Sequence, residues 1–474
     1  MTLGIDAVEK RVREVESGRD LLRFEVDGCC IWPLFRYDVL RTVAAHQVGG
    51  ASRGRLSRAE VLRDTVAGLR TFLLPPRVRH VVRTQASGLS EKHGDLYRDI
   101  WFDDLLASIG SFVKLDAINN PEFAPRRRHA ALPAASTIAG FERIAGVVRR
   151  LAPSKSAAAA AAALHGELAR ELGETAPARE KMQSQVQRFS ASRAVYRHFL
   201  RRIRPRYLLI EWAVASPLVA AARDEGIQVV EFQHGIMRGS FSAYSWPRYA
   251  LPYKERMPVP DRIFVYGDYW AEELRANGFW GDALRVVGSP RHDRYRRVGA
   301  ETAGDAARTL LVTTQGIDVQ NLISFLVRSL EHARANGVRM NVVIKAHPTY
   351  EGAGEVYRTA FAAMKEVRVV GAGEEPSTFQ LLMEADAHAS ISSACHYDAI
   401  GVGVPTIILG LRMHEIVLPL HAAGHAALAM SPEKLVELMA EPSMRLAPSI
   451  SGYYFQPHAV ANMRRELGLA EAQP

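Results

Sequence analysis

From residue 205 onward, short apolar runs rich in β-branched residues alternate with amphipathic stretches. Stretches such as DYWAEELRANG and VQNLISFLVRSLEHARANG have the periodicity of helices and end in the glycine that commonly stops one. Apolar runs that alternate with helices are typical of βα units on a parallel sheet, so the pattern predicts an α/β fold. The predicted strands are YLLIE, IQVVEFQ, RIFVYG, LRVVG, TLLVTT, NVVIKAH, VRVVG, AHASIS and TIILG.

The first 200 residues are less regular. LFRYDVLRTVAAHQV is interpreted as a helix, and RHVVRTQASG as a strand followed by a loop. The alanine-rich segment PSKSAAAAAAALHGELARELGE predicts a helix, since alanine is the best helix former, and a long helix is expected over 178–204. In DLYRDIWFDDLLASIG we interpret Asp99, Asp103 and Asp104 as acids at the start of a helix.

A break in the pattern falls near 247–260, where WPRYALPYKERMPVP holds four prolines. Proline discourages helices and central strands, so this segment is interpreted as a crossover loop between domains. A chain of 474 residues is too long for one typical core. We therefore predict an acceptor-side domain with helical insertions at 1–250 and a donor-binding domain at 251–474.

Composition and charge limit the class of protein. The chain is 48% hydrophobic and 23% charged, as is usual for globular proteins, and no apolar run reaches the roughly 20 residues that span a bilayer. A cytoplasmic location is expected, with the inner face of the cytoplasmic membrane as an alternative. The net charge of +9 favours an anionic partner: a phosphorylated substrate, an anionic lipid surface or a nucleic acid.

Cysteine usage gives no sign of a disulfide framework or a zinc site. The three cysteines are Cys29, Cys30 and Cys395, an odd number without a CxxC pair. Several catalytic signatures are also missing: there is no GxxxxGK[ST], HExxH or GxSxG motif, and no GxGxxG in the context of a Rossmann fold. A P-loop NTPase, a zincin protease, an α/β-hydrolase and a hydride-transfer enzyme are therefore disfavoured.

Polar side chains follow many of the predicted strands, at the edge where ligands bind in open parallel sheets. His234 follows IQVVEFQ, and the glycine after it lets the backbone turn beside the ring. Since imidazole has a pKa near neutrality, His234 is a candidate base or phosphate ligand, with a buried structural histidine as the alternative. Glu211, at the end of YLLIE, either orients His234, acts as a base itself or pairs with an arginine of 201–206.

A second group of polar residues is typical of an anion site. In SISSACHYDAIGVGVP, Ser392 and Ser393 lie between a strand and a helix start, where hydroxyls and free N–H groups favour a phosphate. Asp398, in that helix, is a candidate acceptor from ribose hydroxyls. The alternative is that Ser392 is only an N-cap and Asp398 a residue in solvent. In KAHP, Lys345 and His347 lie on the same side of an extended strand and are candidate phosphate contacts. Three further candidates at strand ends are Gly288, Ser289 and Gln315. The residues Arg291, His292 and Asp293 are weaker candidates for a phosphate or sugar.

Taken in order, five segments resemble the second half of GT-B glycosyltransferases, over about residues 205–430. They are QHG, YGDYWAEELRANGF, VVGSPRHD, KAHP and SSACHYDAIGVGVP. More narrowly, the chain resembles bacterial capsule and cell-wall polymer enzymes related to CDP-glycerol glycerophosphotransferases and capsular Kdo transferases. The resemblance implies two Rossmann-like domains facing a cleft, with the activated donor on the C-terminal domain and no metal or other cofactor.

The resemblance also implies roles for single residues. His234 becomes the base or a phosphate contact, His347 a donor-phosphate contact, Ser392 and Ser393 phosphate ligands, and Asp398 the ribose contact. The expected function is transfer of a sugar from a nucleotide-activated donor to a surface polysaccharide or lipid-linked acceptor, with peripheral contact to an anionic membrane.

Three alternatives remain: transfer of a polyol phosphate from a CDP-alcohol, 2-epimerisation of a UDP-amino sugar, and a non-catalytic protein that binds anionic ligands. Nucleic acid is not an expected partner, because the chain lacks an RRM or KH pattern and a dense basic tail.

Overall fold

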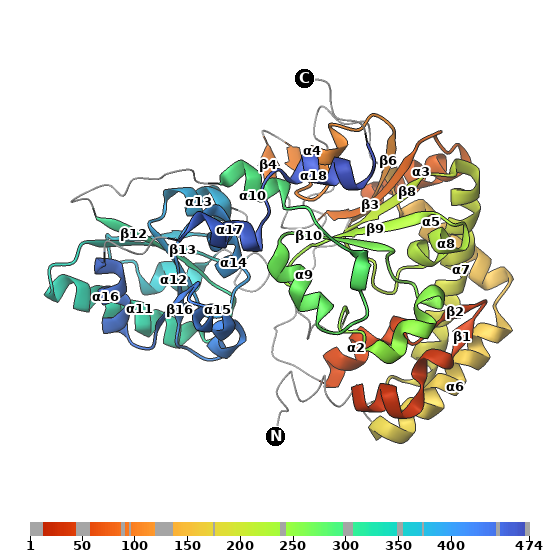
Figure 1. The fold of residues 1–474 in the computed structure, drawn as a ribbon, viewed down its shortest axis with the longest axis horizontal. Coiled ribbons are helices and arrows are strands. Elements are labelled where there is room, and N and C mark those ends of the chain that lie inside the picture. Colours follow the sequence, from red (N-terminus) through yellow and green to blue (C-terminus); the bar gives the residue numbers. More distant parts are fainter. Residues whose placement is uncertain are drawn as a thin grey trace.

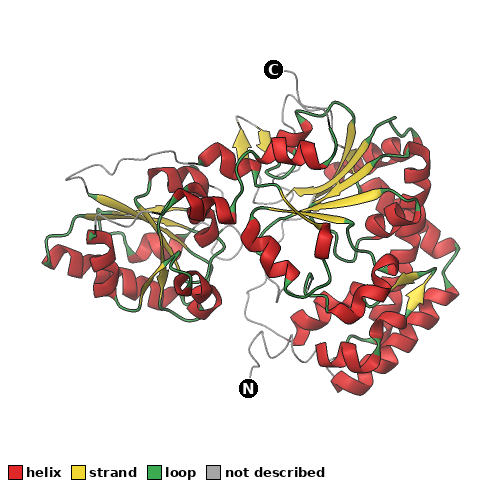
Figure 2. Ribbon diagram, in the orientation of Figure 1, coloured by secondary structure: helices red, strands yellow, loops and turns green. Residues whose placement is uncertain are grey.

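The computed structural model describes residues 13–43, 57–86, 91–93, 96–118, 136–173, 176–237, 243–296, 307–347, 354–371, 374–441 and 446–469. Two parallel sheets with helices on both faces dominate these residues (Figures 1 and 2). The strands buried on both sides read as continuous apolar runs, as parallel sheets require. All nine strands predicted after residue 205 are present, and the α/β fold class is confirmed.

The first sheet has seven strands in the order β11-β10-β9-β8-β3-β6-β7, and all neighbours in it are parallel. Leu208 packs on one face with α5, α7 and α8, whereas Leu209 packs on the other face with α4 and α18. This alternation follows from the two-residue period of a strand. The strands are β3 (His80–Ala86), β6 (Phe112–Ile118), β7 (Ser136–Thr137), β8 (Tyr207–Ile210), β9 (Gln228–Phe232), β10 (Arg262–Val265) and β11 (Leu284–Val286).

The second sheet has six parallel strands in the order β14-β13-β12-β15-β16-β17. Its core lies mainly between the sheet and helices α11 and α16, with a smaller core under α13 and α14. The strands are β12 (Arg308–Thr313), β13 (Met340–Lys345), β14 (Val367–Val370), β15 (Ala387–Ser390), β16 (Thr406–Leu409) and β17 (Ala427–Ala429).

Helices cover both sheets. The alanine-rich and long helices expected from the sequence are α6 and α7. The α-helices in the described part of the chain are α2 (Pro33–Val43), α3 (Arg58–Leu73), α4 (Asp103–Leu106), α5 (Ala139–Leu151), α6 (Lys155–Leu172), α7 (Arg179–Ile203), α8 (Pro217–Asp224), α9 (Asp268–Arg275), α10 (Pro290–Tyr295), α11 (Val319–Ala335), α12 (Glu355–Ala360), α13 (Thr378–Glu384), α14 (Cys395–Val402), α15 (Leu418–Ala422), α16 (Pro432–Ala440), α17 (Pro448–Tyr454) and α18 (Ala459–Glu466).

Four 3-10 helices and two short antiparallel hairpins complete the described elements. The 3-10 helices are η1 (Leu21–Arg23), η4 (Arg248–Arg256), η5 (Gly281–Ala283) and η6 (His414–Val417). The hairpins pair β1 (Glu25–Val26) with β2 (Cys29–Cys30) and β4 (Glu91–His93) with β5 (Leu96–Arg98).

The chain does not cross to the second sheet at the proline-rich segment 247–260. This corrects the predicted division of the domains at 250/251. The segment forms η4 and leads directly into β10, which pairs with β9 in the first sheet. The Asp261 carboxylate anchors this return, because it accepts a hydrogen bond from the Val229 N–H at 2.8 Å and pairs with Arg223 at 2.5 Å. The change of sheet comes later, between β11 and β12.

The end of the chain returns to the first sheet. Ala459, Met463 and Leu467 belong to the core on the α4 face of that sheet (Figure 1). The Asn462 side chain donates a hydrogen bond to the Val287 carbonyl at 3.1 Å. Gly267 lies so close to α17 that a Cβ on it would stand 2.3 Å from the Tyr453 carbonyl oxygen. The core of the first sheet thus includes residues that follow the second sheet in the sequence.

Candidate active site

Hydrogen bonds connect the loops that follow three neighbouring strands of the second sheet. β12 lies between β13 and β15, so the loops that carry His347, Gln315 and Ser392 are adjacent. The Thr314 hydroxyl accepts a hydrogen bond from the His347 N–H at 3.2 Å. Oε1 of Gln315 accepts hydrogen bonds from the N–H and the hydroxyl of Ser392. The structure therefore brings together four of the predicted residues, counting Ser393 beside Ser392, at the carboxyl edge of one sheet.

The two serines are buried and lead directly into α14. Ser392 and Ser393 are 7% and 5% exposed, respectively. The Ser393 hydroxyl accepts a hydrogen bond from the Cys395 N–H at 3.2 Å, which satisfies one of the donors at the start of the helix. Burial lowers the pKa of His347, so this ring is neutral at pH 7 and acts there as a hydrogen-bonding group rather than as a cation.

Lys345 has a different role from the predicted one. Its buried ammonium group donates to three backbone carbonyls: Gly371 at 3.1 Å, Glu374 at 2.6 Å and Pro376 at 3.2 Å. Because an ammonium group has three N–H donors, these contacts use all of them. Lys345 thus ties the loop after β14 to β13, and the sequence-based interpretation as a phosphate contact is not supported by its geometry.

Asp398 faces the unit that contains the first sheet. Its Oδ1 lies 3.2 Å from Nε2 of His292 on α10. The two atoms are close, but their geometry is not that of a hydrogen bond. The His292 ring stacks on Phe455 with centroids 3.5 Å apart, and Gly401 leaves the space that both rings occupy. Burial lowers the pKa of His292, although the neighbouring Asp398 raises it. The Asp398 carboxylate, which the sequence predicts to contact the ribose, is therefore also in contact with His292.

Gly288 and Ser289 support the backbone around α10. Gly288 has a φ of 92°, and a Cβ on it would stand 2.0 Å from the Gln456 carbonyl oxygen. The Ser289 hydroxyl lies 2.9 Å from Nδ1 of His292, within hydrogen-bond distance. These two candidates therefore hold the returning C-terminal segment and orient His292. They are separate from the hydrogen bonds that join Gln315 to Ser392.

In the first sheet, the buried acids Glu211 and Glu231 lie at the ends of neighbouring strands. Glu211 directly follows Ile210 of β8, and Ile210 pairs with Glu231 of β9. Glu211 pairs with Arg83 at 2.8 Å, yet burial raises its pKa to about 7. Its partner is therefore Arg83 rather than an arginine of 201–206. Sequence reasoning missed Glu231, although an acid inside the apolar run VVEF was the available signal.

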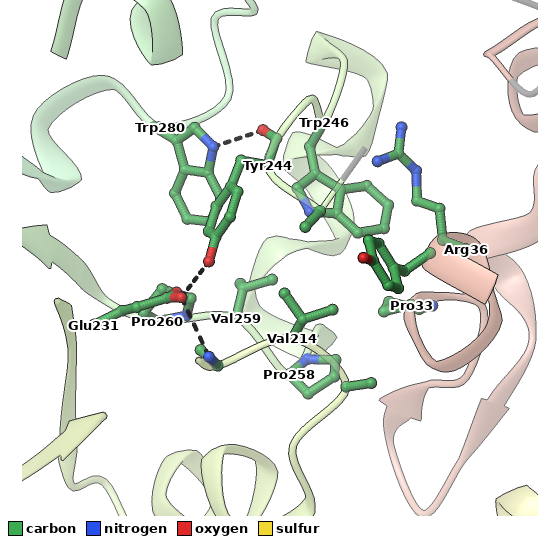
Figure 3. A pocket seen from close by; sticks show the side chains of 14 residues that line it. Pro33, Arg36, Val214, Glu231, Tyr244, Trp246, Pro258, Val259, Pro260 and Trp280 are labelled. Atoms are coloured by element: carbon green, nitrogen blue, oxygen red, sulfur yellow. Dashed lines mark hydrogen bonds between the residues drawn. The ribbon is translucent and has the colours of Figure 1, made fainter. Parts of the chain in front are cut away.

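Glu231 is fully buried, and its surroundings favour the protonated form. Tyr244 donates its hydroxyl proton to Oε1, and the Ala213 N–H donates to the same oxygen at 3.2 Å (Figure 3). Oε2 has no hydrogen-bond partner in the described part of the chain. Burial raises the pKa of Glu231 to about 8, and the nearby Glu211 contributes to this. A neutral carboxyl group at pH 7 can donate as well as accept a proton.

His234 lies beside these acids, between aromatic rings. Its ring centroid is 4.7 Å from that of Trp212, with the rings edge to face, and 6.3 Å from that of Tyr244. This apolar setting lowers the pKa of His234 to about 4, although its surface is partly exposed. Nδ1 has no hydrogen-bond partner among the described residues. A ring with this pKa is neutral at pH 7, so His234 does not act as a charged phosphate ligand there, and its role as a base stays a prediction.

Figure 3 shows a small cavity next to Glu231, enclosed by aromatic and proline side chains. Its volume of about 20 Å³ leaves room for about one water molecule. A sugar ring does not fit inside it. The cavity is lined by Pro33, Arg36, Tyr37, Ala213, Val214, Ala215, Glu231, Ala243, Tyr244, Trp246, Pro258, Val259, Pro260 and Trp280.

Within the residues that the structure describes, no three or more His, Cys, Asp or Glu side chains are grouped to bind a metal ion. In the same part of the chain, no helix combines the length and apolar character needed to cross a membrane.

Comparisons with solved structures identify the fold. UDP-GlcNAc 2-epimerase from Methanocaldococcus jannaschii aligns with 82% of this chain and 99% of its own, at 10% identity and a TM-score of 0.50. A second UDP-N-acetylglucosamine 2-epimerase aligns with 84% and 99%, at 13% identity and a TM-score of 0.50. The calicheamicin glycosyltransferase CalG4 aligns with 83% and 98%, at 14% identity and a TM-score of 0.48. No protein-family model and no curated protein sequence matches the chain.

This chain has a GT-B-like fold with two Rossmann-like domains. The sequence identities are too low to carry more than the fold. The predicted α/β, GT-B-like fold class is thus confirmed.

Proposed function

We propose that this protein is a metal-independent enzyme of nucleotide-activated sugars, and that it transfers the sugar to a surface polysaccharide or lipid-linked acceptor. The observation that carries the proposal lies at the carboxyl ends of β12, β15 and β13. There Gln315 binds Ser392, and the neighbouring Thr314 binds the backbone N–H of His347. Open parallel sheets bind their ligands at this edge. The narrower resemblance to CDP-glycerol and Kdo transferases of capsule and cell-wall polymers belongs to this proposal.

The donor's phosphates are assigned to the start of α14. Backbone N–H groups there point toward a bound anion, and the helix dipole stabilises negative charge as the nucleotide leaves. Ser392 and Ser393 supply hydroxyls, and neutral His347 supplies a ring N–H. Asp398 is assigned to the ribose, in competition with His292.

The acceptor side is assigned to the end of β9. Neutral His234 takes the proton from the attacking hydroxyl of the acceptor as the new glycosidic bond forms, and the donor's bond to the nucleotide breaks. Burial keeps His234 unprotonated at pH 7. The nearby Glu231 is neutral at this pH as well, because burial raises its pKa to about 8.

A second candidate is 2-epimerisation of a UDP-amino sugar. The two solved structures named above with a TM-score of 0.50 are UDP-GlcNAc 2-epimerases, and nearly the full length of each aligns. Epimerisation needs groups that remove and return a proton, and Glu211, Glu231 and His234 are titratable groups gathered at one sheet edge. The donor side is the same in both candidates; they differ in whether an acceptor is required.

The test is a thermal-shift screen with CMP, CDP, UDP, GDP and their sugars, followed by product analysis with donor alone and with donor plus acceptor. A ligand that binds only the folded state raises its melting temperature. Ser392→Ala and His347→Ala are expected to reduce the nucleotide-induced shift, and His234→Ala to keep the shift but lose turnover. His332→Ala on α11 is the control. Turnover of donor alone favours epimerisation, and no nucleotide binding at all contradicts both candidates.

A further inference from the structure

One surface of the first domain is unusually apolar. Nine large hydrophobic side chains are exposed in the described part of the chain, and six of them lie on α3, on the residue after it or on α5. Solvent reaches 75% of Leu74 and 81% of Leu151. Single exposed apolar residues are common, but a concentration on two adjoining helices marks an interaction surface. We name these six side chains the α3–α5 face; they are Leu62, Val66, Leu73, Leu74, Val147 and Leu151.

The two helices that carry the face are packed tightly together. A Cβ on Gly68 of α3 would stand 2.6 Å from the backbone nitrogen of Gly140 on α5, so only glycines allow this approach. The rings of Phe72 and Phe141 meet edge to face next to it, with centroids 5.5 Å apart. Each helix therefore holds the other in place, and the exposed side chains stand on a rigid support.

Helix geometry gathers the apolar residues of α3 into a stripe. Leu62, Val66 and Leu73 follow one another at spacings of four and seven residues, which places them on one side of a helix. The opposite side is buried: Asp64 and Gly68 face the protein. Such a stripe normally packs against another element, yet here it is exposed to solvent.

Arginines border the stripe. Arg58, Arg63 and Arg70 of α3 are exposed, as are Arg143 and Arg150 of α5. Of the acids near them, the buried Asp64 pairs with Arg63, with its Oδ1 3.6 Å from the arginine Nε. Glu60 is engaged in the capping box with Ser57 at the start of α3, and Glu142 is the exposed acid of α5. The face is therefore both apolar and cationic.

We propose that the α3–α5 face docks on the surface of an anionic phospholipid bilayer, with its leucines and valines at the acyl boundary and its arginines on the lipid phosphates. An anionic bilayer suits this face because its negative charge complements the arginines. Helices that lie in a membrane interface combine an apolar stripe with flanking Lys or Arg, and guanidinium groups bind phosphate in a bidentate manner. The proposal concerns this surface alone and does not depend on the nucleotide chemistry.

The first test is flotation of the purified full chain with vesicles of phosphatidylcholine containing phosphatidylglycerol, and with vesicles of phosphatidylcholine alone. We expect the protein to float with the anionic vesicles and to do so less at high salt, because salt screens the arginines. Failure to float with anionic vesicles, or equal flotation with both compositions, overturns the proposal.

The second test uses matched variants. Leu73→Ser with Leu74→Ser is expected to weaken partitioning at least about tenfold, since two large apolar side chains leave the bilayer boundary. The fold should remain intact, because Arg202 binds the carbonyl oxygens of Phe72 and Leu73 without using their side chains. The control is Leu251→Ser with Met430→Ser, two exposed residues outside the face. Equal loss in both double variants, or in neither, contradicts the proposal.

Charge variants separate the membrane from a protein partner. Arg63→Gln and Arg70→Gln are each expected to lower the vesicle partition coefficient about fivefold, in keeping with the contribution of one basic residue near an anionic surface. Sedimentation without vesicles checks self-association. A dimer that Leu73→Ser with Leu74→Ser dissociates, together with absence of vesicle binding, would show that the face is an interface between copies of this chain instead.

Discussion

Oε1 of Gln315 accepts hydrogen bonds from both the backbone N–H and the hydroxyl of Ser392, at 3.1 and 3.2 Å. One amide thus fixes the position of the residue that opens the anion site before α14. Gln315→Ala is expected to weaken nucleotide binding about tenfold, because two hydrogen bonds that orient Ser392 are lost. Calorimetric titration with the nucleotide found in the thermal-shift screen measures this. Unchanged affinity would remove Gln315 from the proposed donor site.

Lys345 is expected to stabilise the fold and not to bind the donor. Lys345→Met leaves the carbonyls of Gly371, Glu374 and Pro376 without their donor. The free energy of unfolding should fall by about 2–4 kcal/mol, as for other buried polar groups that lose a charged partner. Urea denaturation measures the loss. Lys434→Met, at an exposed position of α16, is the control. A stable variant that has lost nucleotide affinity would restore the role in phosphate binding.

Glu231 should give the stability of the protein a recognisable pH dependence. Burial raises its pKa from 4.5 to about 8 in the folded state, so the folded protein holds this proton more tightly than the unfolded chain does. The stabilisation is complete below pH 4.5 and is lost as the pH rises toward 8. Glu231→Gln keeps a neutral side chain and has no such loss.

The free energy of unfolding of Glu231→Gln, relative to the unsubstituted protein, should therefore increase with pH by up to about 1.4 kcal/mol per unit within this window. Denaturation at pH 5, 6, 7 and 8 measures the slope. Glu331→Gln, at an exposed position of α11, is the control and should give a difference that does not vary with pH. A flat profile for Glu231→Gln would mean that Glu231 is charged in the folded protein.

Gly288 is expected to be intolerant of a side chain. In Gly288→Ala the new Cβ meets the Gln456 carbonyl oxygen, and the backbone φ of 92° is unfavourable for alanine. We expect a loss of about 2–4 kcal/mol in unfolding free energy. Gly424→Ala isolates the backbone contribution, because Gly424 has a φ of 73° but no atom within 4 Å of an added Cβ, and should cost only about 1 kcal/mol. Equal losses would show that the contact with Gln456 is unimportant.

Nine of the ten strands described after residue 205 are predictable, because each one is a short apolar run that polar residues bound on both sides. The three-residue strand β17 was not predicted. The same rule placed Gln315, His347 and Ser392 at strand ends, and the parallel pairing of β12, β13 and β15 then makes them neighbours. Strand β6 escaped prediction because FVKLDAI contains Lys114 and Asp116, whose charges hide the apolar pattern. Lys114 is buried there through ion pairs with Asp99 and Asp103, which lie outside the strand.

Other differences depend on contacts that no local pattern contains. The spacing of Lys345 and His347 places both on one side of a strand but says nothing of the carbonyls that surround the ammonium group. The prolines of 247–260 indicate a break in regular structure, yet whether the chain then joins the same sheet depends on Asp261 and the pairing of β10 with β9. Glu231 was missed because an acid within an apolar run has no visible partner until Tyr244 is placed beside it.

The return of α18 to the first sheet affects how the protein is made. Ala459, Met463 and Leu467 cover apolar side chains of strands that were synthesised hundreds of residues earlier. Domains that are continuous in sequence can fold in order as they leave the ribosome, whereas the core of this first domain also needs α18, which follows the second sheet in the sequence. The second sheet, although translated later, is complete in sequence before the first one is. Nascent chains stalled before residue 459 should therefore expose an uncovered face of the first sheet, which is where a chaperone would be needed.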